Sequence, residues 1–561
     1  MSGTARHAGD AGNVRSLPQP IPRGLHRALR LRLERIVKED GALAAMQLLQ
    51  AAAKRANQAP VPLTANDEEL RDLAEAQARA SHGPAQRAST EADALAACNR
   101  RAAQFGIVPP LANTTAGALA RFGDLVWWHR RLRRRQALDI EELAQAFHLV
   151  HAQAGAYVSD ATLERWRGQR QRNGALIETL EAINELGATL ALEELVAHSQ
   201  ANPRNRRAEL MVRIAGFELI ADDLGHVGEF HTLTCSSRMH ATLSSSGTPN
   251  PRYDGTTPRQ AQAHLSGQWQ KARAALSRAG VRSYGFRVAE PHHDGTPHWH
   301  LLLFMPREQV ATVREVLRHY ALETDGDEPG AEERRFTSIA IDKRKGSAAG
   351  YIAKYVAKNI DGFKMGEDGE SRDPRAVAER VNAWASAWGI RQFQQVGGPP
   401  VSVWRELRRL APDPAHALLD RAVCAADAGN WGAFVTLMGG TAARRREHPI
   451  RLHKPWSDRP NRYDEPAGEQ IKGVEGEDFV AISRPHEWTI QRRSTAASEC
   501  CDGGACGQAV RAAHGRARTR DGDGSSMAAA ADSLHAPPPQ CPDATPAPTE
   551  PCQSPGSTAA K

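Results

Sequence analysis

Apolar and polar positions change their spacing along the chain, and this change divides it into regions. From residue 25 to about residue 202, Ala, Leu, Glu and Arg dominate, and apolar residues recur at the intervals of amphipathic helices. A clear example lies between residues 176 and 197, with Leu180, Ile183, Leu186, Leu190 and Leu192. Between residues 216 and 397, short alternating apolar runs are separated by Gly, Pro and Asp clusters, which is typical of strands joined by turns. The pattern predicts an all-α N-terminal region followed by an α+β unit.

Strands and helices alternate within the predicted α+β unit. Strands are predicted at 230–234, 284–290, 298–305 and 335–341. Helices are predicted at 258–279, 307–322 and 347–359. Helical spacing returns from residue 401 to about residue 438, and residues 446–491 are mixed, with short candidate strands.

These patterns give a domain hypothesis. It comprises a disordered N-terminus (1–24), a helical region (25–215), an α+β domain (216–410), a small helical and mixed region (411–493) and a disordered tail (494–561). The tail has few large apolar residues and no aromatic ones, so it has too little apolar surface to offset its ordering entropy. Cysteines crowd this tail at Cys500, Cys501, Cys506, Cys541 and Cys552. They lack the paired Cys-x-x-Cys spacing of a zinc ribbon, so disorder is favoured over a structural zinc site.

Composition narrows the class of protein without naming a function. Of 561 residues, 41% are hydrophobic and 24% are charged, which suits a soluble globular protein. Lys and Arg total 72 against 65 Asp and Glu, and the net charge of +7 permits an anionic partner such as nucleic acid. No apolar run reaches the roughly 18 residues of a membrane span, and the polar N-terminus has no secretory pattern. A cytoplasmic protein without membrane contact is expected.

The densest chemistry lies in the segment 284–304. Because alternate residues of a strand face the same side, His298 and His300 point the same way, about 7 Å apart. The segment 291–297 is predicted to turn the chain back into a hairpin that sets Glu290 beside His298. Two histidines and one carboxylate form a ligand set for a catalytic divalent cation.

Two alternatives to this ligand set stay open. His292 is a rival third ligand, since it precedes the pair in a His-x-Asp arrangement. The histidines could also simply line a surface strand. Four histidines and two acids within eleven residues, at the start of an apolar strand, favour the metal site.

A second constellation lies in the predicted helix 347–359. Tyr351 and Tyr355 are four residues apart and share one helix face, while Lys354 and Lys358 form a pair rotated by about 100°. Amphipathic helices often carry tyrosines for packing alone. Beside a metal site the pattern has a function, because a tyrosine hydroxyl can attack a phosphodiester whose oxygens a divalent ion polarises.

The sequence resembles the HUH endonuclease superfamily, whose His-hydrophobic-His motif corresponds to His298-Trp299-His300. Within it, the chain is similar to the phage replication gene A protein family of rolling-circle initiators. The similarity rests on the strand 230–234, the His-Trp-His strand and the two-tyrosine helix, in family order. Further similar segments are 388–400 and 404–408 and, more weakly, 127–133 and 157–160. His231 departs from the family, in which an apolar residue is commoner at this position.

The resemblance implies a DNA nicking and joining enzyme built on an antiparallel HUH-type sheet with flanking helices. Mg²⁺ or Mn²⁺ would be held by His298, His300 and Glu290. One tyrosine would attack the DNA, leaving a 5′-phosphotyrosine and a free 3′-hydroxyl for a polymerase. The second tyrosine would cut after one circuit so that the circle can be closed, and the order of the two is left open. Lys354 and Lys358 would stabilise the phosphate charge.

Basic side chains suggest where DNA is held. One group surrounds Trp127 and Trp128 on a predicted helix and comprises Arg130, Arg131, Arg133, Arg134 and Arg135. A second group, Lys343, Arg344 and Lys345, precedes the tyrosine helix, and a third surrounds Trp166 with Arg165, Arg167, Arg170 and Arg172. Arginines neutralise phosphates and indoles stack on bases, whereas the alternative is a solvated face over core tryptophans. The chain has no Gly-rich phosphate loop for ATP, so a host helicase and polymerase are expected partners.

Other functions fit parts of the sequence. A conjugative or mobilisation relaxase, or an HUH transposase, also uses clustered histidines, but a relaxase normally carries its tyrosine near the N-terminus. A zinc hydrolase would need a His-Glu-x-x-His helix, which is absent. A non-catalytic DNA-binding regulator would keep the basic faces and make no use of the tyrosines.

Overall fold

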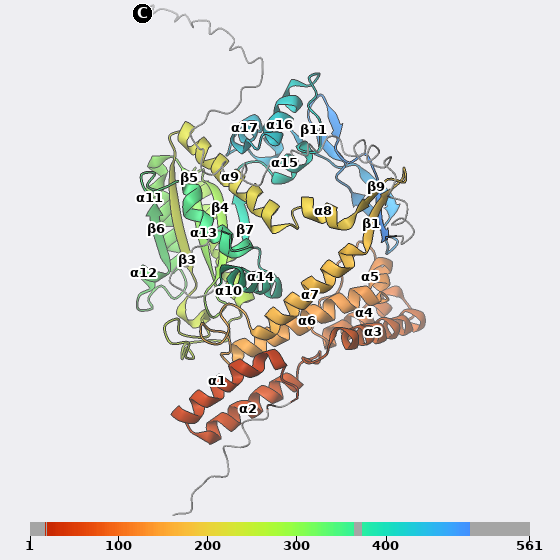
Figure 1. Ribbon diagram of the computed structural model, residues 1–561, viewed down its shortest axis with the longest axis vertical. Helices are drawn as coiled ribbons and strands as arrows, with labels where there is room; N and C mark the ends of the chain where they lie inside the picture. Colours follow the sequence, from red (N-terminus) through yellow and green to blue (C-terminus); the bar gives the residue numbers. More distant parts are fainter. Residues whose placement is uncertain (1–16, 18, 364–372, 494–561) are drawn as a thin grey trace, which may run out of the picture. The chain divides into compact units, whose positions relative to one another are not determined.

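The N-terminal part of the chain is helical. The computed structural model describes residue 17, residues 19–363 and residues 373–493, which all belong to one compact unit (Figure 1). The helices are α1 (Arg23–Glu39), α2 (Ala42–Asn57), α3 (Asp67–Arg87), α4 (Glu91–Gln104), α5 (Thr115–Phe122), α6 (Leu125–Ala146) and α7 (Asp160–Glu178). Several begin at a side chain that accepts a hydrogen bond from the first turn, namely Thr90, Thr114, Asp124 and Ser159. Two apolar cores lie between these helices, one around α1, α2 and α6 and the other around α3, α4 and α6.

Two predictions for this region are corrected by the structure. The predicted helix at 176–197 is wrong, because β1 (Leu180–Asn184) and β2 (Thr189–Ala191) form an antiparallel hairpin there, followed by the short α8 (Leu192–His198). β1 also pairs with β13 (Trp488–Arg492), about 300 residues later in the chain. The predicted disorder of residues 1–24 is wrong for the segment just before α1, since Ile21 is buried in the helical core. Residues 1–16 and 18, and the predicted disordered tail 494–561, lie outside the described residues.

A five-stranded antiparallel sheet forms the α+β unit, with strand order β6-β3-β5-β4-β7. Its strands are β3 (Val227–Thr234), β4 (Tyr284–Pro291), β5 (Pro297–Met305), β6 (Phe336–Ala340) and β7 (Phe393–Val396). The predicted strands are confirmed, and β7 is an addition. The predicted α+β fold, with an antiparallel sheet preceded by helices, is confirmed apart from the β1–β2 hairpin.

Helices cover both faces of this sheet (Figure 1). One face packs on α9 (Pro203–Asp223), α13 (Ala348–Ile360), α15 (Val401–Leu407), α16 (Ala417–Asp427) and α17 (Trp431–Leu437). The other packs on α10 (Pro258–Arg278), α11 (Val310–Leu322) and α14 (Pro374–Trp388), and the short α12 (Ala331–Arg334) precedes β6. Along β5, Leu302 and Phe304 enter the first core, whereas Leu301 and Leu303 enter the second. This alternation puts His298 and His300 on the α13 face of the sheet.

The predicted domain boundaries cross continuous structure. The boundary between 215 and 216 falls inside α9, whose Ile214 and Phe217 share one core with the sheet. The region 411–493 contributes Trp431 and Val474 to the same core, so it has no separate core of its own. Its strands are β8 (Arg451–His453), β9 (Trp456–Pro460), β10 (Pro466–Glu469), β11 (Gly473–Glu475), β12 (Val480–Ile482) and β13. Short 3-10 turns lie at Ser237–Met239, Arg307–Gln309 and Arg445–Glu447. Among the helices that the structure describes, none is both long and apolar enough to cross a membrane.

His231 lies on β3 with its side chain on the face of the sheet away from His300. It is fully buried and stacks on Phe336, and neither ring nitrogen has a hydrogen-bond partner within the described chain. Burial lowers the pKa of His231 to about 4, and Arg314 adds to this effect while Glu229 opposes it. The folded protein therefore holds the neutral ring in a range where an unfolded histidine takes up a proton.

We expect acid to destabilise the fold through His231. A depressed histidine pKa contributes stability above pH 6.5 that is lost as the pH falls toward 4, amounting to about 2 kcal/mol at pH 5. His231→Leu removes this pH-dependent contribution to stability. The thermal midpoint of the variant should therefore fall less between pH 7.5 and pH 5 than that of the wild type. Equal slopes in scanning calorimetry would contradict the assignment.

Candidate active site

The site is built on the hairpin between β4 and β5. His292 N donates to Thr296 O at 2.8 Å, and Gly295 takes a positive φ of 86° at the tip of the turn. The Asp294 carboxylate accepts from the backbone N–H of Thr296 at 3.0 Å. This turn sets the register in which Glu290 lies directly opposite His298, as the sequence predicts.

Glu290, His298 and His300 converge on one point. Their candidate ligand atoms all lie within 4.8 Å of one another. His300 Nε2 is 3.9 Å from Glu290 Oε2, and the two side chains are 7% and 2% exposed. His292 is outside this set, although its ring centroid is 4.1 Å from that of His298. The geometry therefore favours Glu290 over His292 as the third member.

The histidines present free nitrogens toward this point. Thr232 Oγ1 lies 3.1 Å from His300 Nδ1, which orients the ring and leaves Nε2 available. In the described part of the chain, His300 Nε2 and His298 Nδ1 are buried and have no hydrogen-bond partner. Buried polar atoms are normally satisfied, so the orphaned nitrogens beside a carboxylate fit a divalent cation.

Burial also sets the protonation of this set. It lowers the pKa of His300 to about 3, with a smaller effect from Lys358 in the same direction. Burial, with His292 nearby, lowers the pKa of His298 well below its usual range. Both rings are therefore neutral at neutral pH, the form that binds metals. Burial raises the pKa of Glu290, although Lys358 and Asn359 favour its charged form, so a neighbouring cation would stabilise this carboxylate further.

Helix α13 bears both tyrosines and places Tyr355 against the set of Glu290, His298 and His300. Ser347 is its N-cap, and the Glu218 carboxylate of α9 accepts hydrogen bonds from Ala348 N and Ala349 N, where the helix dipole favours negative charge. The ring of Tyr355 packs on His300, with 4.2 Å between centroids, and on Phe230 at 5.2 Å.

The remaining predicted residues of α13 differ in their relation to the set. Tyr351 lies one turn before Tyr355 and is half-buried. Burial, and to a lesser extent the Glu290 charge, raise the pKa of Tyr355, while Lys358 opposes this. Lys358 Nζ lies 3.3 Å from Glu290 Oε2, and Lys354 Nζ lies 5.1 Å from the centroid of the Tyr355 ring.

Asn359 was not among the predicted site residues, yet it contacts the set directly. Its Nδ2 donates to Glu290 Oε1 at 2.6 Å, and its Oδ1 accepts from Gln392 Nε2 at 3.0 Å. It lies four residues after Tyr355, so helical spacing could have placed it on the tyrosine face. Its carboxylate partner lies on a strand nearly 70 residues away, which spacing could not reveal.

The N-terminal region supports the hairpin turn. Tyr157 has a positive φ of 73°, donates its N–H to His293 O at 3.0 Å and stacks on the His293 ring. Gln145 Nε2 donates to Asp294 O at 2.7 Å, and Lys358 Nζ lies 5.3 Å from the Tyr157 ring centroid. The segment 157–160, noted for its weak family similarity, thus lies beside the site.

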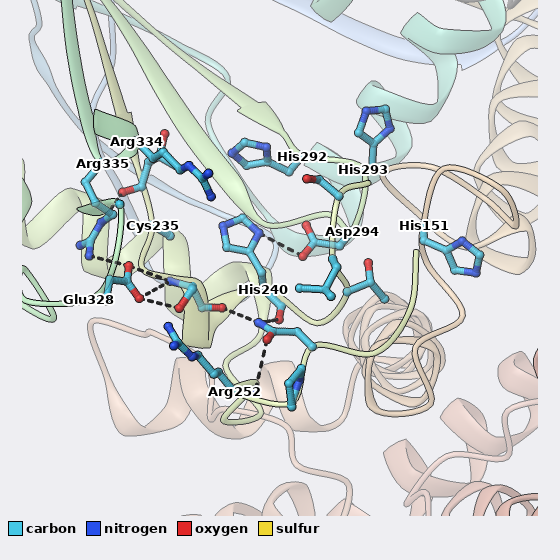
Figure 2. Close-up of a pocket in the computed structure, with 18 of the residues that line it drawn as sticks. His151, Cys235, His240, Arg252, His292, His293, Asp294, Glu328, Arg334 and Arg335 are labelled. Carbon is cyan, nitrogen blue, oxygen red and sulfur yellow. Dashed lines mark hydrogen bonds and ion pairs between the residues drawn. The ribbon is translucent and has the colours of Figure 1, made fainter. Parts of the chain in front are cut away.

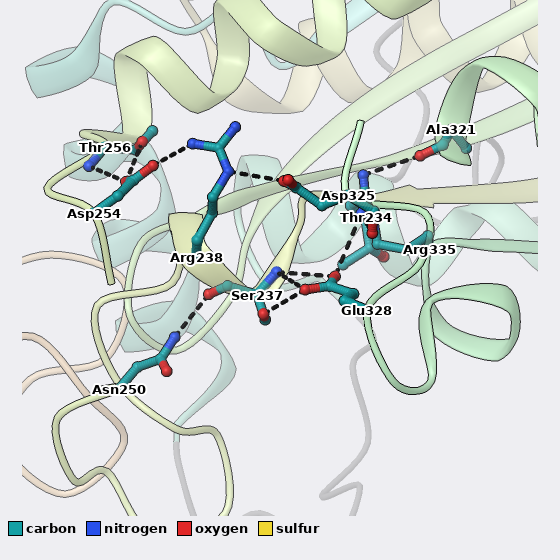
Figure 3. A network of polar contacts seen from close by, with 10 residues as sticks. All are labelled: Thr234, Ser237, Arg238, Asn250, Asp254, Thr256, Ala321, Asp325, Glu328 and Arg335. Carbon is teal, nitrogen blue, oxygen red and sulfur yellow. Dashed lines mark hydrogen bonds and ion pairs between the residues drawn. The ribbon is translucent and has the colours of Figure 1, made fainter. Parts of the chain in front are cut away.

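A cavity of about 570 Å³ lies on the other side of the turn, a size suited to a small ligand or a nucleotide (Figure 2). His240 Nδ1 is bonded to Asp294 Oδ2 at 3.1 Å, and its ring lies 5.0 Å from that of His292. Residues that line the cavity, among them Ser237, Glu328 and Arg335, belong to a network of polar contacts that extends beyond it (Figure 3). In it, Arg238 bridges Asp254 and Asp325, while Glu328 bonds both Ser237 and the buried Arg335.

The predicted DNA-binding residues differ in their availability. Trp127 and Trp128 are buried in a helical core, which favours their alternative interpretation as core residues. On α6, Arg130, Arg131 and Arg134 are exposed, whereas Arg133 pairs with Asp67 and Arg135 with Asp139. Before α13, Lys343 pairs with Asp222 and Arg344 with Asp342, and Lys345 is exposed.

Residues 65–363 match the model of the bacteriophage replication gene A protein (GPA) family. The chain belongs to this family. The resemblance to the replication gene A protein family that the sequence motifs indicate is thereby confirmed, although the similar segments 388–400 and 404–408 lie beyond the matched residues.

Relatives of known name agree with this membership. The replication gene A protein of Escherichia phage 186 is 42% identical over 417 residues, covering 69% of this chain and 59% of that protein. The replication protein of Haemophilus phage HP1 is 40% identical over 381 residues, covering 65% and 48%. A probable replication endonuclease from a prophage-like region of Salmonella typhi is 38% identical over 416 residues, covering 70% and 51%. The chain therefore spans about half to three fifths of the length of these relatives. No solved structure matches the chain.

We expect Asn359 to stabilise the buried Glu290 carboxylate through its hydrogen bond. Asn359→Asp would place two carboxylates in contact, and at pH 7.5 it should lower the free energy of unfolding by about 2 kcal/mol. At pH 5.5 this loss should shrink, because one of the two carboxyls takes up a proton. Thermal midpoints at both pH values provide the measurement. The control Asn359→Ala loses a hydrogen bond that favours the charged form of Glu290 but adds no charge, so its deficit should shrink less at pH 5.5 than that of Asn359→Asp. Parallel behaviour of both variants would refute the coupling.

Proposed function

We propose that the protein is a metal-dependent, HUH-type endonuclease that nicks and rejoins single-stranded DNA to initiate rolling-circle replication. The observation that carries the proposal is the packing of Tyr355 against His300, within the cluster of Glu290, His298 and His300. Family membership and relatives named as replication proteins and probable replication endonucleases support it.

The cleavage step is a transesterification. The tyrosine oxygen forms a bond to the scissile phosphorus, and the bond from phosphorus to the 3′-oxygen breaks. The phenolic proton is transferred to the departing 3′-oxygen, so the products are a 5′-phosphotyrosine and a 3′-hydroxyl. One phosphoester bond replaces another, which preserves the energy for rejoining without ATP. Bound Mg²⁺ or Mn²⁺ would neutralise charge on the phosphate oxygens.

The chain's own residues have distinct parts in this proposal. Glu290, His298 and His300 would hold the ion, and Thr232 and Asn359 would orient two of these ligands. Lys354 lies at the exposed side of Tyr355, where its ammonium can meet phosphate oxygens. Lys358, now beside Glu290, adds positive charge at the same place.

Two tyrosines on one helix suit two successive cuts. Tyr355 lies against His300, and Tyr351 is one turn away on the same helix, so either can approach a phosphate held at the set. One tyrosine stays linked to the first end while the other cuts the regenerated origin. The released 3′-hydroxyl then attacks the first phosphotyrosine and closes the circle.

The setting follows from this chemistry. The substrate is origin DNA in single-stranded form, and the cavity beside His292 has room for a nucleotide next to the scissile phosphate. A host helicase would expose the strand and a host polymerase would extend the 3′-hydroxyl. The reaction would take place in the cytoplasm of the bacterial host.

Covalent capture tests the nucleophiles. The full chain, with Mn²⁺ and tiled labelled oligonucleotides from the replicon that encodes it, should form a tyrosyl-DNA adduct within the peptide that contains Tyr351 and Tyr355. Tyr351→Phe combined with Tyr355→Phe should abolish the adduct, whereas each single variant should still form one. Tyr320→Phe, on the opposite side of the sheet, is the control. Undiminished cutting by the double variant, measured by gel and mass spectrometry, would end the two-nucleophile proposal.

Metal removal tests the ion. Cleavage should stop in a chelator and return with Mn²⁺ or Mg²⁺. His298→Ala and Glu290→Gln should each weaken Mn²⁺ binding by at least about 100-fold. Titration calorimetry measures this affinity. His319→Ala, an exposed histidine on α11, should bind Mn²⁺ as the wild type does. Full activity in the chelator would rule out the proposed ion.

A further inference from the structure

A second pocket lies at the C-terminal end of α13, away from the hairpin turn, and we call it the α13-end pocket. Its volume is about 380 Å³, within the range of ligand pockets. Its principal lining residues come from four elements or their ends: Trp166, Arg170, Arg206, Asp361, Phe363 and Arg375. The pocket therefore joins the N-terminal helix α7 to the helices around the candidate active site.

The α13-end pocket is continuous with the active site along one helix. Asn359 binds Glu290, and the next residue, Ile360, already lines the pocket. Asn382 of α14 donates to Ile360 O at 3.1 Å and holds this end of the helix. Five residues separate Tyr355 from Ile360, a rise of about 7.5 Å along the helix. That is about two nucleotide steps of a stacked strand.

The two acids that line the pocket form their ion pairs with arginines outside it, although the Asp361 charge also acts on Arg206 at longer range. Asp361 pairs with Arg207, and Glu379 pairs with Arg167 at 2.8 Å, and neither of these arginines lines the pocket. The three lining arginines, Arg170, Arg206 and Arg375, form no ion pair with any described residue. The Nε atom of Arg206 is buried without a hydrogen-bond partner in the described structure. Guanidinium groups in this state are suited to binding an anionic ligand that is not part of the chain.

Aromatic rings lie between these cations. Trp166 is half-buried beneath Arg170, whose guanidinium carbon is 4.8 Å from the ring centroid. Phe363 is 49% exposed and lies beneath Arg207 at 3.8 Å. Alternation of flat aromatic surface with arginines is the pattern of proteins that bind single strands without regard to sequence.

We infer that the α13-end pocket binds the single DNA strand flanking the scissile phosphate, with a base stacked on Trp166 and the backbone held by Arg170, Arg206 and Arg375. The inference rests on the proposed function for the identity of the strand. An acidic protein segment would use the arginines alone, whereas a nucleic acid uses both the arginines and the rings. The pocket gives the N-terminal region a direct part in holding the substrate.

Binding can be measured without cleavage. The full chain carrying Tyr351→Phe and Tyr355→Phe is titrated with a fluorescein-labelled oligothymidylate of about 20 nucleotides, and anisotropy reports affinity. In this background, Trp166→Ala should weaken binding about tenfold, and Trp166→Phe should retain most of the affinity. Combined Arg170→Ala and Arg206→Ala should lower the slope of log affinity against log salt by about 0.7 per arginine.

Matched controls separate a local effect from a general one. Trp456→Ala and Arg421→Ala remove an exposed ring and an exposed cation elsewhere on the chain, and both should bind as the background protein does. An oligomer with abasic sites should bind the background protein as weakly as the intact oligomer binds Trp166→Ala. Circular dichroism spectra and thermal midpoints of all variants establish that they are folded.

Two results would overturn the inference. Unchanged affinity and salt slope in folded pocket variants would exclude DNA and leave an acidic protein as the occupant. An equal loss of affinity in the control variants would show that the effect is not local. Failure of covalent capture, with the pocket effects intact, would count against the proposed function and leave the binding site standing.

Discussion

The pairing register of β4 and β5 is the constraint on which the site depends. It sets Glu290 opposite His298, and a slip of one residue would turn His298 and His300 into the core that holds Trp299. Gly295 fixes the turn with its positive φ. At the other end, a side chain at Gly285 would place Cβ 2.0 Å from Leu302 O, so only glycine permits this close pairing. The ligand geometry is thereby determined by backbone structure at both ends of the hairpin.

The same hairpin determines where the tyrosine helix lies. Taking the Glu290 carboxylate out of water costs several kcal/mol unless it is paired, and both of its α13 partners, Lys358 and Asn359, follow Tyr355 within one turn. The interactions that stabilise the buried acid therefore also hold the Tyr355 ring against His300. In this arrangement the position of the proposed nucleophile is a consequence of satisfying a buried charge, and it does not require a dedicated contact of the hydroxyl.

Local sequence patterns predicted four of the five strands of the central sheet, all but β7, and most of the side chains that meet at the candidate site. They did so because β5, its turn and α13 each show their period within a dozen residues. Features that depend on distant partners could not be predicted in this way. The leucines at 180–192 fit helical spacing, but pairing of β1 with β13 makes a strand there. The sequence alone did not decide whether Trp127 packs in a core or contacts DNA, and in the structure the surrounding helices bury it. Asn359 lay at the correct helical spacing, but its role required knowledge of where Glu290 faces.

The N-terminal helices and the sheet act as one structure at the site. Tyr157 adopts an unfavourable backbone conformation to bond His293 O, and Gln145 bonds Asp294 O in the same turn. These contacts fix the turn while α13 contacts Glu290 of the same hairpin, so the hairpin is held by two elements that are far apart in sequence. The family match, which runs from residue 65 to residue 363, covers both elements. Under the proposed function, a helical region that only delivered DNA to the sheet would not need to contact the turn, so its contacts there favour one site in which DNA is both held and cut.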